Sequence, residues 1–269
     1  MKFLAYWGME RDPFQKDVRP SNLTRTNDLE QAMGGLGFAF QTGGIALLTG
    51  KSGYGKTTIL RSFIAGLPAG VFMCCYLKLS TVKVGEFYKM LARALGLEAY
   101  RTKTENFENI QNKLKNLRKE EKVMPIVILD EAQYLNRDIL IELPILMNFD
   151  MDSKEYALLV LCGLPSLNPK LSMEQYESLN DRLVFNHDIS GMTLEEVRQY
   201  IHDRMSEAGV NRNIFDESAM AAAQGASRNS VRRLNHILVK SLMIGCTDGL
   251  KSINADTIRK AVEEIKLGN

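Results

Sequence analysis

The sequence predicts an α/β fold in which a parallel sheet is flanked by helices and followed by a helical lid. Between residue 44 and residue 162, short apolar runs alternate with helical segments, which is typical of βαβ units. The first apolar run enters a glycine-rich turn. After Gly191 only helical patterns remain. A chain of 269 residues is long enough for one large domain with a small second one.

The individual elements follow from the same patterns. Four buried strands are expected, at 44–49, 71–79, 125–130 and 157–162. A helix capped by Asn27 and Asp28 precedes them. Helices are expected between the strands at 58–67, 84–95 and 107–119, and in the lid at 194–208, 216–224, 230–245 and 254–266. We therefore expect an N-terminal segment and helix (1–40), an α/β core (41–192) and a helical lid (193–269).

Composition is that of an ordinary globular protein, with 45% hydrophobic and 25% charged residues and a net charge of +2. This charge neither requires nor excludes a nucleic-acid partner. The four cysteines show no zinc-ligand or redox-pair spacing. No apolar run approaches the roughly 20 residues needed to cross a bilayer. We expect a cytoplasmic protein with reduced thiols and no membrane partner.

Residues 50–57, GKSGYGKT, match the phosphate-binding loop pattern. Glycines let successive backbone N–H groups and the following helix N-terminus face a phosphate. Lys56 would reach the β- and γ-phosphates of ATP, and the Thr57 hydroxyl would ligate Mg²⁺. The alternative is a chance glycine turn, which the preceding strand and following helix disfavour. The candidate ATP-binding residues here are Gly50, Ser52, Gly53, Tyr54, Gly55, Lys56, Thr57 and Thr58.

A carboxylate pair completes the predicted site. Asp130 and Glu131 directly follow the apolar run at 126–129. Asp130 would hold Mg²⁺ together with Thr57, and Glu131 would be the catalytic base that polarises the attacking water. A lone Asp-Glu pair after a strand is usually only a solvated strand end, but its combination with the phosphate loop favours a Mg²⁺-dependent ATPase.

Beyond these motifs, the sequence resembles AAA+ ATPases of the ExeA/TnsC/TniB/MuB group, most closely the TnsC-like transposition regulators. The resemblance implies the AAA+ P-loop NTPase fold and covers nearly the whole chain. The segments that carry it are YWGM at 6–9 with PF at 13–14, LDEAQYL at 129–135, LMNFD at 146–150, GLPSL at 163–167, the stretch 179–182, the helix from 194 to 204, and SVRRLN at 230–235.

The resemblance implies further roles for arginines. Arg182 would be a catalytic arginine finger directed at a neighbouring subunit's γ-phosphate. Arg232 would contact ATP from the lid, with Arg228 and Arg233 as alternates. For each of these, an ion-paired surface residue is the alternative. Cys162 and Gly163 would stand at the sensor position of the fourth strand, followed by Leu164 where the family often has Gln. The missing polar sensor makes slow hydrolysis one expectation.

The family's activities lead to the functional hypotheses. ExeA-type secretion ATPases add a membrane span and a peptidoglycan-binding region, neither of which we expect here. TnsC-like proteins form homo-oligomers, as rings or filaments, on double-stranded DNA and recruit a transposase, in some cases with a target-selection protein. Between residues 78 and 122, eleven basic residues stand against six acidic ones. The candidates for non-specific contacts with the DNA backbone are Lys78, Lys83, Arg101 and Lys103.

Two alternatives remain beside the transposition hypothesis. The first is an ATPase that acts on a protein partner, in secretion or helicase loading, without DNA binding. The second is a nucleotide-binding scaffold with negligible turnover, which the intact Lys56, Asp130 and Glu131 disfavour and Leu164 keeps open. For most of the basic residues at 113–122, the alternative to DNA contact is a charged helix face that is only exposed to solvent.

Overall fold

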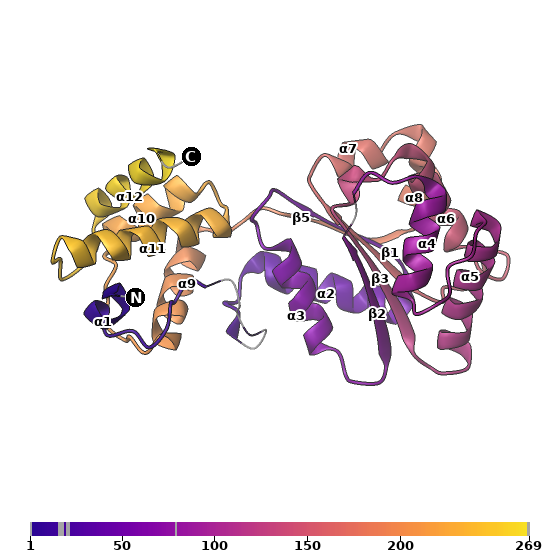
Figure 1. Ribbon diagram of the computed structural model, residues 1–269, viewed down its shortest axis with the longest axis horizontal. Helices are drawn as coiled ribbons and strands as arrows, with labels where there is room; N and C mark the ends of the chain where they lie inside the picture. Colours follow the sequence, from indigo (N-terminus) through magenta and orange to yellow (C-terminus); the bar gives the residue numbers. More distant parts are fainter. Residues whose placement is uncertain (1, 16–18, 20–21, 79, 268–269) are drawn as a thin grey trace. The chain divides into compact units, whose positions relative to one another are not determined.

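The computed structural model describes residues 2–15, 19, 22–78 and 80–267 (Figure 1). The chain divides into two compact units. The helical unit contains Met1–Leu29, Ser52–Gly55 and Ser190–Asn269, and the α/β unit contains Glu30–Lys51 and Lys56–Ile189. The N-terminal stretch that the sequence sets apart as 1–40 is thus shared between the two units. The boundaries expected after residues 40 and 192 remain predictions.

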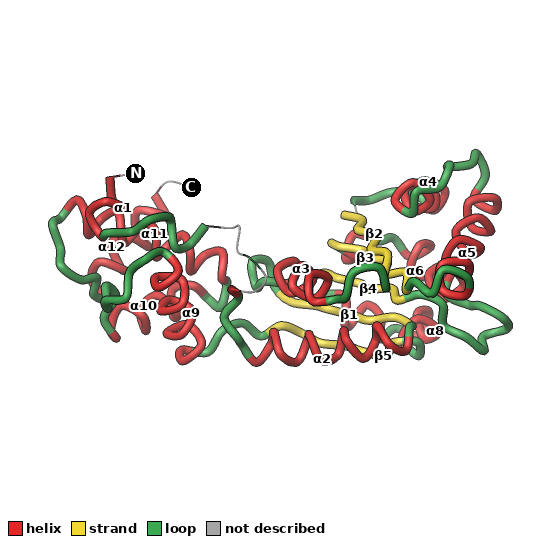
Figure 2. The backbone as a smooth tube through the Cα atoms, turned by 90° about the horizontal axis from the view of Figure 1, so that it is seen from below, coloured by secondary structure: helices red, strands yellow, loops and turns green. Residues whose placement is uncertain are grey.

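The α/β unit is built on a five-stranded parallel sheet, which confirms the predicted fold class (Figure 2). The strand order is β2-β3-β4-β1-β5. The three central strands are buried along their whole length, because helices cover parallel sheets on both faces. The strands are β1 (Gly44–Gly50), β2 (Phe72–Lys78), β3 (Met124–Asp130), β4 (Leu158–Gly163) and β5 (Leu183–Ile189).

The fifth strand, β5, was not expected from the sequence. Its residues alternate in exposure, with Val184, Asn186 and Asp188 open to solvent, because β5 lies at the edge of the sheet beside β1. Half-buried edge strands lack the continuous apolar run that marks a central strand. The other four strands lie within one or two residues of their predicted positions. Leu79, the predicted last residue of β2, lies outside the described residues.

Helices of the α/β unit pack on the strands that precede or follow them, with α3 on β1, α4 on β2 and α5 on β3. Helix α5 begins earlier than predicted because Thr102 caps it and pairs reciprocally with Glu105. Helix α6 was not predicted, and its N-cap is Asn136. The helices are α2 (Asn27–Thr42), α3 (Lys56–Gly66), α4 (Val84–Ala94), α5 (Lys103–Lys119), α6 (Arg137–Leu146), α7 (Leu167–Leu171) and α8 (Glu177–Asn180), with the 3₁₀ turns η2 (Ala132–Tyr134) and η3 (Glu174–Tyr176).

The helical unit combines α1 (Lys2–Trp7) with α9 (Leu194–Glu207), α10 (Glu217–Ser227), α11 (Val231–Thr247) and α12 (Ala255–Leu267). The last four match the predicted lid helices closely. Side chains of Thr193, Asp216 and Ser230 cap α9, α10 and α11, each satisfying a backbone N–H that the first turn leaves without an intrahelical partner. In the described part of the chain, no helix is both long and apolar enough to cross a membrane.

The N-terminal residues of the helical unit are anchored by buried aromatic side chains. Trp7 is 1% exposed and donates from Nε1 to the carbonyl of Leu242 at 2.9 Å. Phe14 contacts the rings of Tyr200 and Phe215. These contacts make residues from the start of the chain part of the same core as the C-terminal helices.

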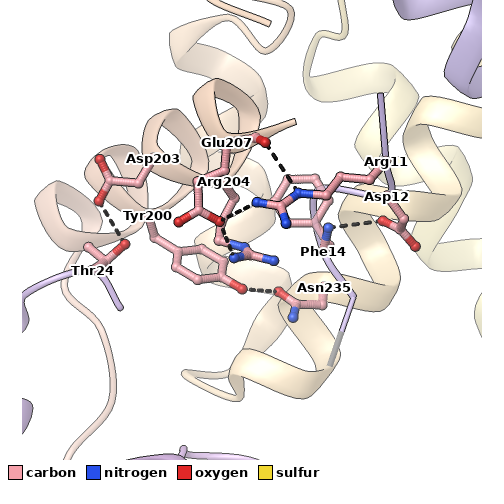
Figure 3. Close-up of polar contacts among 9 residues, drawn as sticks. All are labelled: Arg11, Asp12, Phe14, Thr24, Tyr200, Asp203, Arg204, Glu207 and Asn235. Atoms are coloured by element: carbon pink, nitrogen blue, oxygen red, sulfur yellow. Dashed lines mark hydrogen bonds and ion pairs between the residues drawn. The ribbon is translucent and has the colours of Figure 1, made fainter. Parts of the chain in front are cut away.

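Polar contacts surround these anchors (Figure 3). Glu207 accepts from the buried Arg204 at 2.6 Å and from Arg11 at 3.4 Å. The Tyr200 hydroxyl donates to Asn235 at 2.8 Å. A buried charge is tolerated only when it is paired and hydrogen-bonded, so Glu207 holds Arg204 in the core and also ties the N-terminal segment to α9.

Candidate nucleotide site

The phosphate loop begins at Gly50, the last residue of β1, and ends at the start of α3. Within the α/β unit, the Lys56 ammonium donates to the carbonyl oxygens of Gly50 at 2.7 Å and Lys51 at 3.2 Å. The side chain is therefore folded over the loop at the N-terminus of α3, where backbone N–H groups favour an anion. Thr57 and Thr58 follow in the first turn of α3, both exposed.

The middle of the loop, Ser52–Gly55, belongs to the helical unit and lies against the start of α11. Gly53 has a φ of +82°, and a Cβ there would lie 2.4 Å from Ser230 Oγ. Any other residue at this position would meet both backbone strain and a steric clash. The carbonyl of Gly53 also accepts from the backbone N–H of Arg232 at 3.3 Å. The glycine thus allows close contact between the loop and α11.

Among the three candidate arginines, Arg232 directs its guanidinium at the loop, with Nη1 3.4 Å from Ser52 Oγ. Arg228 contributes its carbonyl, which accepts from the Tyr54 hydroxyl at 2.9 Å. The backbone N–H of Arg233 donates to the N-cap Ser230. The structure therefore brings Arg232 to the loop by its side chain, while Arg228 and Arg233 contact Tyr54 and Ser230 through their backbones.

The two predicted Mg²⁺ ligands lie together at the carboxyl edge of the sheet. Thr57 Oγ1 is 3.5 Å from Asp130 Oδ2, although β4 separates β3 from β1 in the sheet. Asp130 is only 5% exposed, and its Oδ1 accepts from the backbone N–H of Glu131 at 2.9 Å. A hydroxyl and a carboxylate are the hard oxygen ligands that Mg²⁺ prefers. The residues present therefore fit Mg²⁺ bound with phosphates.

Tyr76, which was not assigned a role from the sequence, also contacts Asp130. Its hydroxyl donates to Asp130 Oδ2 at 2.5 Å. Tyr76 is 46% exposed, and partial desolvation together with the hydrogen bond to Asp130 raises its pKa. The only sequence signal is a tyrosine in the mostly apolar strand β2, two residues before its last residue, Lys78. Burial and the nearby Asp130 also raise the pKa of the Cys162 thiol at the end of β4, so this thiol remains protonated.

Glu131 has a left-handed backbone conformation, with a φ of 59°, which is uncommon for residues other than glycine. Its Oε2 accepts from Gln133 Nε2 at 2.6 Å, and Gln133 Oε1 accepts from the backbone N–H of Leu164 at 3.0 Å. Thus the predicted catalytic base is connected to the end of β4 through one side chain. Gln133 is a second residue whose role sequence reasoning missed.

Arg182 lies apart from the other predicted catalytic residues of the α/β unit. Its carbonyl accepts from the N–H of Ile45 at the amino end of β1, whereas the phosphate loop leaves the carboxyl end. Its guanidinium pairs with Asp152 at 2.6 Å and Glu155 at 3.8 Å, and its side chain is 15% exposed. The contacts inside this chain are those of an ion-paired residue, so an arginine-finger role requires a second subunit.

The four predicted DNA contacts differ in their surroundings within the α/β unit. Lys78 ends β2, in register with Asp130. Lys83 is the N-cap of α4 and Arg101 lies shortly before α5, and all three side chains are exposed. Lys103 forms an ion pair with Glu142, lies 5.8 Å from the Tyr88 ring centroid and is 44% exposed. Three of the four therefore present open positive charge.

Comparison with known proteins shows which family and which solved structures this chain is similar to. Residues 40–171 match the family model described as an AAA domain. General secretion pathway protein A of Aeromonas hydrophila is 26% identical over 272 residues, an alignment that covers 98% of this chain and 48% of that protein. The chain thus spans about half the length of the curated relative it matches.

Solved structures show the same fold. Cdc6p of Pyrobaculum aerophilum has a TM-score of 0.71 at 20% identity, over 94% of this chain and 70% of that one. Drosophila ORC bound to DNA has a TM-score of 0.68 at 17% identity, over 98% and 66%. Aeropyrum pernix ORC1 in complex with DNA has a TM-score of 0.64 at 19% identity, over 94% and 68%. These likenesses show the fold of this chain, and residues 40–171 are similar to the AAA domain family.

Proposed function

We propose that this protein is a Mg²⁺-dependent AAA+ ATPase that oligomerises on duplex DNA and recruits or regulates a transposase. The single observation that carries the ATPase assignment is the arrangement of Lys56, Thr57, Asp130 and Glu131 at the carboxyl edge of one sheet. A phosphate-binding loop, a pair of hard oxygen ligands and a carboxylate base are the parts that phosphoryl transfer to water requires.

Each residue has a distinct task in this proposal. Lys56 and the loop N–H groups bind and orient the β- and γ-phosphates. Thr57 and Asp130 hold Mg²⁺, which would neutralise charge developing on the phosphate oxygens. Glu131 orients the attacking water and accepts its proton. Arg232 contacts the nucleotide beside Ser52.

Assembly would follow from the position of Arg182. Because its own phosphate loop leaves the opposite edge of the sheet, its guanidinium is available only to a nucleotide on another copy of the chain. That copy would have to compete with Asp152 and Glu155 for the guanidinium. ATP would then stabilise homo-oligomers, as a ring or a filament, and hydrolysis would weaken them.

The DNA part of the proposal is supported by exposed charge at Lys78, Lys83 and Arg101, and by the DNA present in the ORC structures that share the fold. Lys103 is retained as a contact, although Glu142 competes for its charge. The transposase, with or without a target-selection protein, comes from the sequence resemblance to TnsC-like regulators. Cytoplasmic localisation is part of the same proposal.

Hydrolysis is tested by phosphate release from ATP with and without Mg²⁺. We expect Mg²⁺-dependent turnover in the wild-type chain, loss of ATP binding in Lys56→Ala, and retained ATP binding with strongly slowed turnover in Glu131→Gln. Removing a general base typically slows the chemical step by about 10²–10⁴-fold. Wild-type ATP binding without turnover would instead support the nucleotide-binding scaffold.

Assembly on DNA is tested with fluorescent duplex DNA at two salt concentrations, in the presence of ATP, ADP or a non-hydrolysable analogue. We expect cooperative binding only with ATP or the analogue, and weaker binding at higher salt because phosphate contacts release counterions. Lys83→Ala/Arg101→Ala should reduce binding, whereas Lys251→Ala, an exposed residue of the helical unit, should not. Arg182→Ala should prevent ATP-dependent assembly while leaving ATP binding by the monomer intact.

A second candidate function is an ATPase that acts on a protein partner. Similarity to General secretion pathway protein A over almost the whole chain favours it. It predicts ATP turnover without nucleotide-dependent DNA binding. The same DNA experiment therefore separates the two candidates.

A further inference from the structure

The amide of Gln133 lies between two groups that fix its orientation. The backbone N–H of Leu164 can only donate, so the amide oxygen must face it, at 3.0 Å. The amide nitrogen then faces Glu131 Oε2, at 2.6 Å. A carboxylate only accepts, so the opposite orientation of the amide would place two pairs of like groups in contact. The geometry allows one arrangement, in which Gln133 links the carboxylate to β4.

Gly163, the last residue of β4, is fitted to this link. A Cβ at this position would lie 2.6 Å from Gln133 Oε1 and 2.5 Å from Leu167 Cδ1. Its φ is not in the left-handed region, so backbone conformation does not require a glycine here. The requirement comes from the close approach of the Gln133 amide and of Leu167. The end of β4 therefore leaves room for this particular side chain.

The end of β4 offers no amide, hydroxyl or charged side chain of its own. The strand ends with Cys162 and Gly163 and is followed by Leu164, and Cys162 is fully buried. The polar group that meets Glu131 beside this strand is supplied instead from η2, two residues after the catalytic base. Gln133 thus supplies a polar side chain at a position where β4 itself has none.

We propose that Gln133 is a positioning residue for ATP hydrolysis, which holds the Glu131 carboxylate against the end of β4 in the orientation needed to accept a proton from water. This inference rests on the proposed ATPase activity. A glutamate side chain has several rotatable bonds, and its left-handed backbone does not by itself fix the carboxylate. If the carboxylate is already oriented before the reaction, the entropic cost of ordering it does not add to the activation free energy of the chemical step.

The test uses Gln133→Met, which keeps the length of the side chain and removes both hydrogen bonds. We expect kcat to fall by about ten- to hundredfold, the range that a misplaced catalytic group produces. We expect KM for ATP and the Kd of ATP to change by less than about twofold, because the side-chain hydrogen bonds of Gln133 are made with Glu131 and Leu164 and not with the proposed phosphate-binding residues of the α/β unit. Tyr134→Phe, an exposed residue of the same 3₁₀ turn, is the control and should retain the wild-type kcat.

Gly163→Ala approaches the same link from β4. Its added methyl group would displace the Gln133 amide, so we expect kcat to fall as in Gln133→Met. Combining the two substitutions should cost little more in kcat than Gln133→Met alone, because both remove one link. Circular dichroism melts of each variant separate a loss of the link from a loss of the fold.

The decisive comparison repeats Gln133→Met in a Glu131→Gln background. If Gln133 acts through Glu131, the residual single-turnover rate of Glu131→Gln should be the same with and without the second substitution. An equal fall in both backgrounds, or an unchanged kcat in Gln133→Met alone, would overturn the positioning role while the ATPase assignment stands. A wild-type chain that binds ATP without turnover would overturn the proposed activity itself.

Discussion

The two units of this chain differ in how their functional residues are brought together. In the α/β unit, Lys56, Asp130 and Glu131 come from two short motifs, each at the carboxyl end of a parallel strand. In the helical unit, residues before Leu29 share one core with helices that begin after Ser190. A sheet edge gathers motifs by topology alone, whereas the helical unit depends on anchoring contacts between segments far apart in the sequence.

The anchors and the sheet also rest on different interactions. The central strands of the α/β unit are held by continuous aliphatic burial and backbone pairing. The first residues of the helical unit are held by a few large side chains, above all Trp7, and by ion pairs around Glu207. A segment held by a few large contacts is sensitive to single substitutions. Among these anchors, Trp7 is the largest side chain, so its removal should have the greatest effect.

Trp7→Ala should produce the largest effect on stability. The ring is buried between α1 and α11, where Gly245 leaves room for it, and its Nε1 satisfies the carbonyl of Leu242. We expect the free energy of unfolding to fall by about 3–5 kcal/mol, as for other buried aromatic side chains truncated to alanine. Thermal melts followed by circular dichroism measure this change.

Tyr6→Ala provides the matched control, because Tyr6 precedes Trp7 in the same short helix but is exposed. It should cost much less than Trp7→Ala. Equal losses from the two substitutions, or a small loss from Trp7→Ala, would contradict the view that one buried ring anchors the N-terminal residues.

Arg232→Ala tests the part of the helical unit that meets the phosphate loop. A guanidinium that donates to a phosphate is worth about 1.5–3 kcal/mol, which corresponds to roughly ten- to hundredfold in Kd for ATP. Arg233→Ala, one residue further along α11, should change the Kd by less than about twofold. Fluorescent nucleotide titrations give both values. Similar losses in the two variants would contradict the specific role of Arg232.

Most of the α/β fold could be predicted from sequence because buried parallel strands are read as continuous apolar runs. Four strands and the helices of the lid follow this pattern or the helical one. The misses have physical reasons. The edge strand β5 is half exposed, and α6 combines a mostly apolar face with an internal proline, Pro144. The docking of α1 on α11 depends on contacts over more than 230 residues, which no local pattern encodes.

The site shows the same division. Lys56, Thr57 and Asp130 were predicted together and lie together, because their motifs specify both chemistry and position. Tyr76 and Gln133 were missed because each acts through a hydrogen bond to a carboxylate that only the packed structure reveals. Short motifs therefore predict the proposed ligand-binding residues better than the residues that form hydrogen bonds with them.

Tyr76→Phe tests one of these missed residues. The phenol hydroxyl orients the carboxylate of Asp130, and because partial desolvation and Asp130 raise the pKa of Tyr76, it remains a donor at neutral and mildly alkaline pH. Loss of a residue that orients a metal ligand typically weakens metal binding by about 10–100-fold. We expect the lower end of this range, about tenfold, in the Mg²⁺ concentration that gives half-maximal ATP turnover. An unchanged Mg²⁺ requirement would show that Asp130 is held without Tyr76.

Asp150→Asn should produce the smallest effect and sharpens the contrast between buried and exposed ion pairs. Lys115, Tyr156 and Lys119 donate to this partly exposed carboxylate of the α/β unit and hold the pKa of Asp150 well below its ordinary value of 3.8. Because the folded pKa is lowered, the stabilisation is complete above pH 3.8 and is lost as the pH falls further. Asp150→Asn should thus lower Tm slightly at pH 7, with a difference from the wild-type Tm that shrinks toward pH 3.

Glu108→Gln, at an exposed position of α5, is the control. A constant difference across this range would show that the carboxylate charge is not what stabilises the loop, in contrast to the buried Arg204–Glu207 pair of the helical unit.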